Sequence, residues 1–158
     1  MIVEATIEIP MGTKNKFEID KKSGKIKLDR VLYSSLTYPG EYGFIENTLS
    51  SDGDALDILI LSYFPTFPGC IVDARIIGYL DVIDNGDADQ KVIAVLDKDP
   101  RFEHIKEIED ISDHQLIEIK DFFKNYKTLQ NIKVEAREFH SRSEAEQLIL
   151  NETIKEVN

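Results

Sequence analysis

The chain has 158 residues, 42% of them hydrophobic, and 30 Asp and Glu against 19 Lys and Arg give a formal net charge of −11. This length is enough to bury one core without a disulfide or structural metal, so we predict a single domain over residues 1–158. The lone cysteine, Cys70, excludes an internal disulfide. The acidic balance argues against nucleic acid and anionic lipid as partners, because both are bound chiefly through Lys and Arg. With no apolar run near ~18 residues and no signal peptide, we expect a cytoplasmic protein that does not enter a membrane.

The first two thirds of the chain carry the patterns of short strands. Residues 3–9 alternate between apolar and polar side chains, which predicts a strand with one face toward the core. Residues 17–20 and 25–29 flank a connection that contains Gly24, and they predict a hairpin. Apolar and β-branched runs predict further strands at 56–61, 70–78 and 91–96. The whole region suggests about six or seven strands.

The last third changes to a helical period. Apolar residues at Leu116, Ile119, Phe123 and Tyr126 predict a helix over 113–126 with Asp113 as its N-cap. A strand over 133–139 follows, and then a second helix. We predict that this helix begins at Ser143 with Glu146 completing a capping box. The order predicts an α+β fold, a small closed OB-like β-barrel of about five main strands with two helices packed outside.

The most informative motif for function is the acidic stretch Asp52-Gly53-Asp54-Ala55-Leu56-Asp57. It places three carboxylates directly before an apolar strand, with a glycine that frees the backbone. Carboxylates without nearby His or Cys suit Mg²⁺ or Mn²⁺ better than Zn²⁺. An acidic, solvent-exposed turn explains the motif equally well when it is taken alone, so both interpretations stay open at this point.

A second acidic group runs from Asp84 to Asp89 and leads into the strand at 91–96. Neither acidic loop fits an EF-hand, because the glycine and glutamate positions of that motif are not met. Taken alone, the Asp84 group is a hairpin tip, but two such loops could converge on one metal site. Cys70 stands at the start of the predicted strand at 70–78 and is expected to be buried as a small apolar residue.

Cations and phenols near the ends of predicted elements could bind the anionic part of a metal–anion complex. The cations are Lys16, Arg30, Lys91 and Lys127, and the phenols Tyr38 and Tyr42 lie in a segment that we interpret as a Gly-rich loop, residues 38–43. Each of these residues is also compatible with a surface charge or a partly buried ring.

In this order, the motifs resemble the family I soluble inorganic pyrophosphatases, over essentially the whole chain. The resemblance rests on the acidic motif at 52–57 and on its neighbours: residues 7–10, 16–20, 29–30, 38–43, the Asp84 loop with Lys91, and 122–127. It implies hydrolysis of pyrophosphate, bound as its metal complex, by a water that bridges two Mg²⁺ ions. It also implies Mn²⁺ as a substitute, Ca²⁺ as an inhibitor, and a homo-oligomer, a hexamer in the family.

The resemblance also assigns roles to individual residues. It makes Asp54 the general base, and it gives the tightest metal to Asp52, Asp57 and Asp89. The metals that arrive with substrate would be served by Asp84, Asp89, Glu18 and, more distantly, Glu8. Phosphate oxygens would be bound by Lys16, Arg30, Tyr42, Tyr126 and Lys127, supported by Lys91 and Tyr38. This chain departs from the family at Asn85, where many members carry an acid, and this puts the weaker metal sites in question.

Two other functions are considered. A phosphohydrolase of the haloacid dehalogenase type also uses a DxD motif, with the first Asp as nucleophile. There the motif follows a strand, whereas here it precedes one. A non-catalytic β-barrel binding module is the second alternative, and a test of turnover would separate it from an enzyme.

Overall fold

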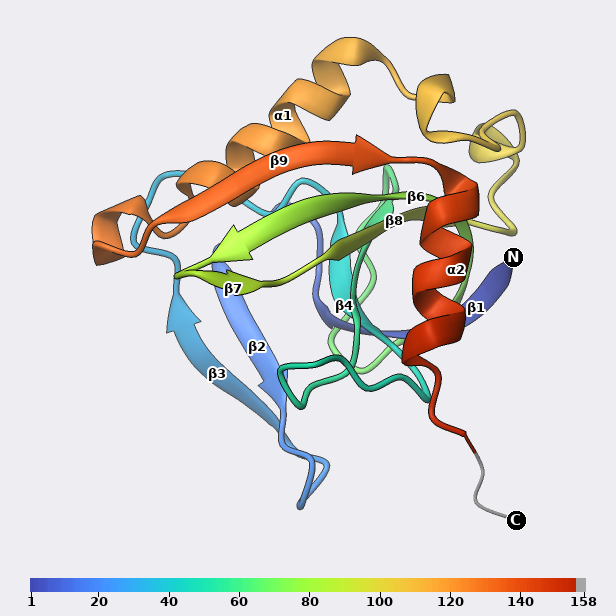
Figure 1. The fold of residues 1–158 in the computed structure, drawn as a ribbon. Helices are drawn as coiled ribbons and strands as arrows, with labels where there is room; N and C mark the ends of the chain where they lie inside the picture. Colours follow the sequence, from blue (N-terminus) through green and yellow to red (C-terminus); the bar gives the residue numbers. More distant parts are fainter. Residues whose placement is uncertain (156–158) are drawn as a thin grey trace.

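The fold is known from a computed structural model that describes residues 1–155. Five strands close into a barrel (Figure 1). They are β1 (Ile2–Ile9), β4 (Glu41–Ile45), β5 (Asp57–Leu61), β8 (Lys91–Leu96) and β6 (Ile71–Asp84), which pair in that order. The ring closes because β1 pairs with both β4 and β6. Only β5 and β8 run parallel among the pairs of this ring; the others are antiparallel.

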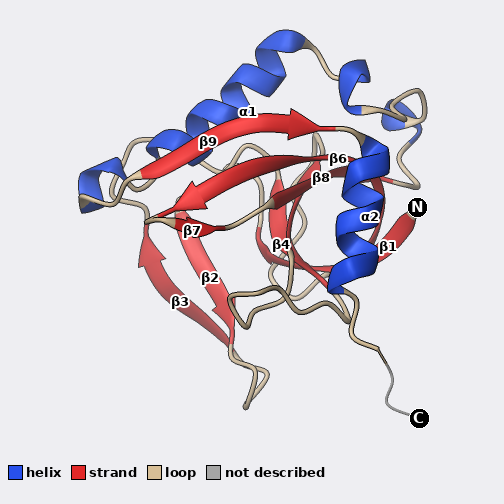
Figure 2. Ribbon diagram, in the orientation of Figure 1, coloured by secondary structure: helices blue, strands red, loops and turns tan. Residues whose placement is uncertain are grey.

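The remaining strands extend or flank the barrel. β7 (Asp87–Ala88) and β9 (Val134–His140) both pair with β6, whose register shifts after Ile76 and after Leu80. β2 (Asn15–Ile19) and β3 (Ile26–Val31) form a separate two-stranded sheet. Figure 2 shows this β2–β3 hairpin standing apart from the barrel.

Two α-helices lie outside the barrel, as the sequence predicts. α1 (Asp113–Asn125) packs along β9, and α2 (Arg142–Glu152) packs on β6 (Figure 1). Three short 3₁₀ helices, Pro100–Phe102, Ile108–Asp110 and Thr128–Gln130, lie in the connections. The α+β barrel is therefore confirmed, and the strand–helix alternation of a haloacid dehalogenase fold is not found in residues 1–155. No helix within this range is both long and apolar enough to cross a membrane.

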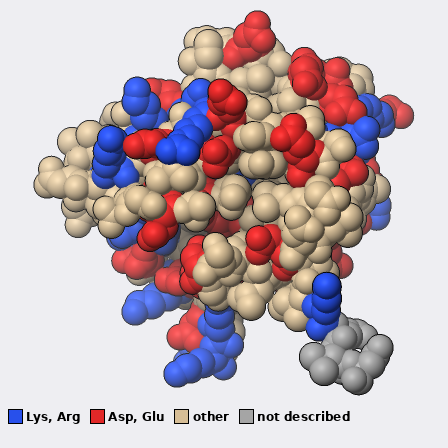
Figure 3. Space-filling model, viewed as in Figure 1, with Lys and Arg blue, Asp and Glu red and all other residues tan. Residues whose placement is uncertain are grey.

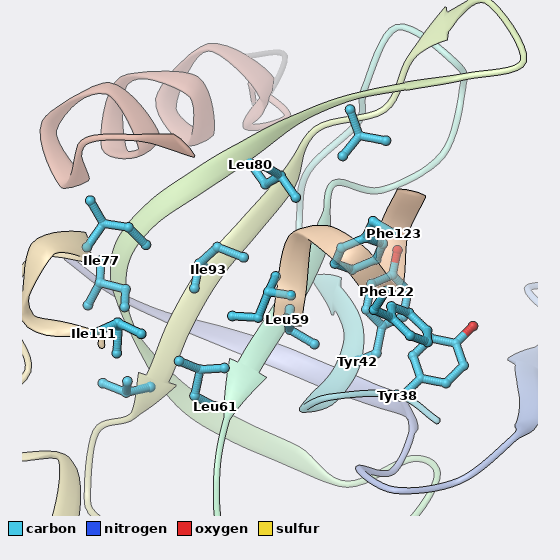
Figure 4. Close-up of a cluster of buried hydrophobic side chains, with 14 of the residues drawn as sticks. Tyr38, Tyr42, Leu59, Leu61, Ile77, Leu80, Ile93, Ile111, Phe122 and Phe123 are labelled. Carbon is cyan, nitrogen blue, oxygen red and sulfur yellow. The ribbon is translucent and has the colours of Figure 1, made fainter. Parts of the chain in front are cut away.

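Alternate residues of each barrel strand face opposite sides, which gives two hydrophobic clusters. Ile58 and Ile60 of β5 belong to the cluster that α2 completes with Ala145 and Ile149. Leu59 and Leu61 belong to the other cluster, which α1 completes with Ile119, Phe122 and Phe123 (Figure 4). Full burial of each such side chain contributes about 1.5–3 kcal/mol. Since the apolar face of α1 is used in this way, it is not available as an interface between subunits.

Several boundaries differ from the sequence predictions. The chain up to Leu96 contains eight strands rather than six or seven, and β6 continues to Asp84 instead of ending at residue 78. Residues 41–43 are not part of a loop but belong to β4. The glycines around Tyr42 are typical of loops, but Gly43 serves another purpose. A Cβ there would lie 1.9 Å from the Thr6 carbonyl oxygen, so glycine is what lets β4 lie against β1.

Both helix starts are also corrected. α1 is capped by Ser112, whose hydroxyl accepts a hydrogen bond from the Gln115 N–H, so Asp113 is the first residue of the helix and not its cap. The capping box of α2 lies two residues earlier than predicted, at Ser141 and Glu144, and the helix begins at Arg142. Cys70 is half-buried rather than buried, because it lies in the turn before β6.

Candidate active site

Asp57 and Lys91 form the buried centre of the site. Each is the first residue of its strand, and the parallel pairing of β5 with β8 makes them register partners. Lys91 Nζ donates hydrogen bonds to Asp57 Oδ2 at 2.8 Å, to Asp89 Oδ2 at 2.8 Å and to the Tyr42 hydroxyl at 2.7 Å. The Tyr42 hydroxyl in turn donates to Asp57 Oδ2 at 2.7 Å. One ammonium group therefore holds together side chains from β4, β5 and the connection between β7 and β8.

Burial and charge oppose each other in this network. The Lys91 side chain is only 2% exposed, and burial, the largest single effect, would lower its pKa. Asp57, together with Tyr42, Tyr126 and Asp89, outweighs burial and raises the pKa well above its usual range. Burial also raises the pKa of Asp89, with Asp57 adding to the effect and Lys91 opposing it. Lys91 therefore stays charged and compensates two acids that would otherwise repel each other.

Three phenols with raised pKa values line the same region. Burial is the main cause for Tyr38, Tyr42 and Tyr126. The rings pack on one another and on α1. The centroids of Tyr38 and Tyr42 are 5.4 Å apart (Figure 4), and the Tyr126 centroid lies 5.0 Å from that of Phe122. With raised pKa values, these hydroxyls are protonated at neutral pH. The Tyr42 hydroxyl donates its hydrogen bond to Asp57, and those of Tyr38 and Tyr126 can donate hydrogen bonds to an anion.

The acidic motif forms a tight loop at the start of β5. The Asp54 N–H donates to Asp52 Oδ1 at 2.9 Å, and Gly53 between them has a φ of +87°, which favours glycine. The Asp54 side chain is 71% exposed and accepts a hydrogen bond from Lys21 Nζ at 2.9 Å. Asp54 and Asp52 are therefore exposed carboxylates of the motif, whereas Asp57 is tied into the buried network.

The β2–β3 hairpin supplies charges from the opposite side. Lys16 and Arg30 are register partners, and both approach Asp29, with N–O distances of 3.1 and 3.7 Å. Arg30 Nε is buried, and no acceptor among residues 1–155 forms a hydrogen bond with it. Glu8 accepts a hydrogen bond from the Ile19 N–H at 2.9 Å, which ties the hairpin to β1. Burial raises the pKa of Glu8, although this hydrogen bond lowers it.

These groups surround one cavity of about 550 Å³. Thirteen of the fourteen predicted site residues line it: Glu8, Lys16, Glu18, Arg30, Tyr38, Tyr42, Asp52, Asp54, Asp57, Asp89, Lys91, Tyr126 and Lys127. The fourteenth, Asp84, lies outside the lining and is paired with Lys127. Two charged residues that the sequence analysis did not single out, Asp20 and Lys21, also line the cavity. Asp20 and Lys21 follow Lys16 and Glu18 directly in the same hairpin, and this closeness in the sequence could have indicated them.

The donor set of the cavity fits a hard divalent cation. Seven carboxylates line it, and no histidine or cysteine does so. Within residues 1–155, however, no three acidic, histidine or cysteine side chains are close enough together to form a metal cluster. The reason is visible in the contacts, since Lys91 lies between Asp57 and Asp89, and Lys21 is paired with Asp54.

Asn85 lies at the tip of the β6–β7 hairpin, as predicted for this acidic loop. Asn85 and Gly86 have φ angles of +52° and +90°, which are the positive values that a two-residue hairpin turn requires at both central positions. Asn is one of the few residues other than glycine that adopts this conformation readily. The turn geometry therefore gives a conformational reason for Asn at this position.

Comparison with known proteins agrees with the resemblance seen in the sequence. A family model described as inorganic pyrophosphatase matches residues 5–158. The chain is 52% identical over 148 residues to the inorganic pyrophosphatase of Geobacillus stearothermophilus, covering 94% of this chain and 90% of that protein. The solved structure of inorganic pyrophosphatase from Thermus thermophilus is similar with a TM-score of 0.93 and 41% identity, over 96% of this chain and 88% of that chain. The Helicobacter pylori inorganic pyrophosphatase is similar with a TM-score of 0.92 and 40% identity, over 96% and 91% of the two chains.

Proposed function

This chain belongs to the inorganic pyrophosphatase family, and we propose that it hydrolyses inorganic pyrophosphate to two orthophosphates in an Mg²⁺-dependent reaction. The observation that carries the proposal is the buried Nε of Arg30, a residue that lines the cavity: it lies 3.7 Å from Asp29 Oδ2 and forms no hydrogen bond with any acceptor among residues 1–155. A buried donor of this kind is rare in a folded protein unless a ligand completes it. An oxygen of a phosphate is a suitable acceptor for a guanidinium group.

The acidic side of the cavity would hold the metal. Asp52, Asp57 and Asp89 are the ligands we propose for the tightest Mg²⁺, with Asp84, Glu18 and Glu8 serving ions that accompany the substrate. Bound Mg²⁺ would lower the pKa of water and screen the negative charge of the phosphates. We propose that Mn²⁺ can replace it and that Ca²⁺ inhibits.

Asp54 would act as the general base. Its carboxylate is 71% exposed at the cavity wall, so water can reach it, and the Asp52 hydrogen bond to its backbone N–H fixes the loop that carries it. The base accepts a proton from the attacking water as the oxygen approaches phosphorus. Among residues 1–155 the Asp54 side chain is paired with Lys21 and not with the buried Lys91 network, so its chemistry can be removed without dismantling that network.

The remaining polar groups would bind the phosphates. Lys16, Arg30 and Lys127 supply positive charge, and Tyr42 and Tyr126 supply neutral hydroxyl donors, with Lys91 and Tyr38 in support. Donors held in place by packing stabilise the charge that develops on the leaving phosphate without having to reorganise. The aromatic contacts of Tyr42 and Tyr126 with α1 serve this positioning.

The test is phosphate release from pyrophosphate by the purified protein, with Mg²⁺ and with EDTA. Rapid release that requires Mg²⁺ and is inhibited by Ca²⁺ is expected. If the protein binds Mg²⁺, as judged by a raised melting temperature, yet releases no phosphate, the proposal is wrong and a non-catalytic binding module takes its place.

We also propose that the chain forms a homo-oligomer, a hexamer by family resemblance. Ile117 on α1 is 60% exposed and His114 is also exposed on this helix, so the solvent-facing side of α1 is a candidate contact. Light scattering on the purified protein would give the mass directly, and a monomer at micromolar concentration would overturn this part of the proposal.

A further inference from the structure

The tip of the β2–β3 hairpin is a preformed arm beside the cavity. Asp20 Oδ1 accepts hydrogen bonds from the backbone N–H groups of Lys22 at 2.7 Å and Ser23 at 3.0 Å. The Asp20 backbone closes the turn with Lys25 and Gly24, both at 2.8 Å. An aspartate that accepts hydrogen bonds from the following backbone amides stabilises a turn in the folded chain. The tip therefore presents its side chains from a defined backbone.

This arm is basic although the protein is acidic. Lys21 and Lys22 lie in the connection, and Lys25 and Lys27 follow. Figure 3 shows blue side chains gathered at the lower end of the molecule, where Figure 1 places the hairpin tip. Of the two lysines in the turn, Lys21 lines the cavity and Lys22 does not.

Lys21 is paired with the carboxylate that we propose as the general base. Its Nζ lies 2.9 Å from Asp54 Oδ1, with the two side chains 72% and 71% exposed. The other cationic pairs of the cavity are less exposed, at 28% and 35% for Lys16 with Asp29, and 16% and 15% for Lys127 with Asp84. Exposed ion pairs contribute little to stability, so this pair is the one that an entering anion can exchange most easily.

We propose that Lys21 is a substrate-positioning residue that exchanges its partner, binding Asp54 in the free protein and a phosphate oxygen when pyrophosphate enters. Pyrophosphate carries several negative charges and competes well for one ammonium group. The exchange would also release Asp54 Oδ1 from Lys21, so that either oxygen of this carboxylate could accept a proton. This inference rests on the proposed function.

The first experiment measures binding of imidodiphosphate, a pyrophosphate analogue with a non-hydrolysed bridge, by titration calorimetry in the presence of Mg²⁺. Lys21→Met should weaken binding about tenfold, while Lys21→Arg should retain most of the affinity. Lys22→Met removes the same charge from the same turn outside the cavity and should change affinity by less than about twofold. Equal affinity in Lys21→Met and the unchanged protein, or equal losses in Lys21→Met and Lys22→Met, would overturn the proposal.

The second experiment tests the exchange itself. Asp54→Asn should tighten imidodiphosphate binding, because Lys21 no longer has to leave a carboxylate. Part of any gain would come simply from removing a negative charge, and that part would also be seen in a Lys21→Met background. A gain that is clearly larger when Lys21 is present supports the exchange, whereas equal gains in the two backgrounds would show that Lys21 and Asp54 act independently and would overturn it.

Steady-state kinetics distinguishes this inference from the proposed function. Lys21→Met should raise KM about tenfold and change kcat by less than about threefold, since the lost contact is made to bound substrate. A protein that releases no phosphate but shows the binding pattern above would contradict the proposed function alone. Full activity with an unchanged KM in Lys21→Met would contradict the role of Lys21 alone.

Discussion

Lys91 Nζ and Asp57 Oδ2 lie 2.8 Å apart because their residues are register partners at the first positions of two parallel strands. The two residues are 34 positions apart in the chain. Their side chains lie on the face of the sheet that carries Leu59 and Ile93, so a hydrophobic cluster continues directly into the charged network. The barrel core therefore positions the network.

Lys91→Met should destabilise the fold strongly. The variant leaves Asp57 and Asp89 facing each other without the ammonium group, and breaking a buried pair in this way lowers the free energy of unfolding by about 3 kcal/mol. Urea unfolding would measure the change. Mg²⁺ should add more stability to this variant than to the unchanged protein, because the cation would reduce the repulsion between Asp57 and Asp89 that Lys91 otherwise compensates.

The matched control is Lys98→Met, which removes a lysine that is 84% exposed and pairs with Asp73. It should change the free energy of unfolding by less than about 0.5 kcal/mol. Similar losses in the two variants would mean that Lys91 is not specifically required to compensate the buried acids.

Asp54→Asn should abolish most of the turnover and leave the fold intact. Loss of a general base lowers kcat by about 10²- to 10⁴-fold, whereas the exposed Asp54 side chain supports no buried contact. Phosphate release and the Mg²⁺-dependent rise in melting temperature would be measured together. The control Asp73→Asn alters another exposed aspartate that pairs with a lysine, outside the cavity, and should keep full activity. Loss of both turnover and Mg²⁺ stabilisation in Asp54→Asn would instead identify Asp54 as a metal ligand.

Asn85→Asp should reduce the Mg²⁺ concentration needed for half-maximal activity by about two- to threefold, since one added surface charge contributes less than about 1 kcal/mol. The fold should tolerate the change, because Asp adopts the positive φ of +52° at this position nearly as readily as Asn does. Activity is measured as a function of Mg²⁺ concentration.

Asn47→Asp is the control for this prediction. Asn47 also has a positive φ, of 60°, but it does not line the cavity. Its backbone carbonyl accepts a hydrogen bond from the Ile154 N–H, next to the end of α2. It should leave the Mg²⁺ dependence unchanged. If Asn85→Asp also leaves the Mg²⁺ dependence unchanged, the lack of an acidic side chain at this position does not affect the weaker metal sites, and the prediction is wrong.

Ser141→Ala should destabilise the protein by about 1 kcal/mol, because the serine hydroxyl accepts the Glu144 N–H at the start of α2. Ser143→Ala should have almost no effect, since Ser143 is exposed within the helix. Thermal or urea unfolding of both variants would compare the two positions. A larger loss of stability in Ser143→Ala than in Ser141→Ala would mean that Ser143 caps the helix, as the sequence predicts.

The two serines show why a local pattern did not settle this boundary. Ser141 with Glu144 and Ser143 with Glu146 both fit a capping box. The choice is made by β9, which pairs with β6 as far as His140 opposite Tyr79. The chain leaves the sheet there and can enter the helix at once. Only the register of a distant strand contains that information.

By itself, the sequence determined the class of fold, the ordered motifs of the family and the chemical types in the cavity. Hydrophobic periodicity and residue type are local properties, and they were sufficient for the fold class and the chemical types, whereas the family motifs came from the resemblance to known pyrophosphatases. The sequence missed β4, because Gly43 is typical of a loop until the approach of Thr6 is known. Tertiary structure alone decided that Lys91 lies between Asp57 and Asp89, that Arg30 Nε is left without an acceptor among residues 1–155, and that Lys21 reaches Asp54. These relationships depend on which strands pair and in which register, and pairing joins residues that no local pattern connects.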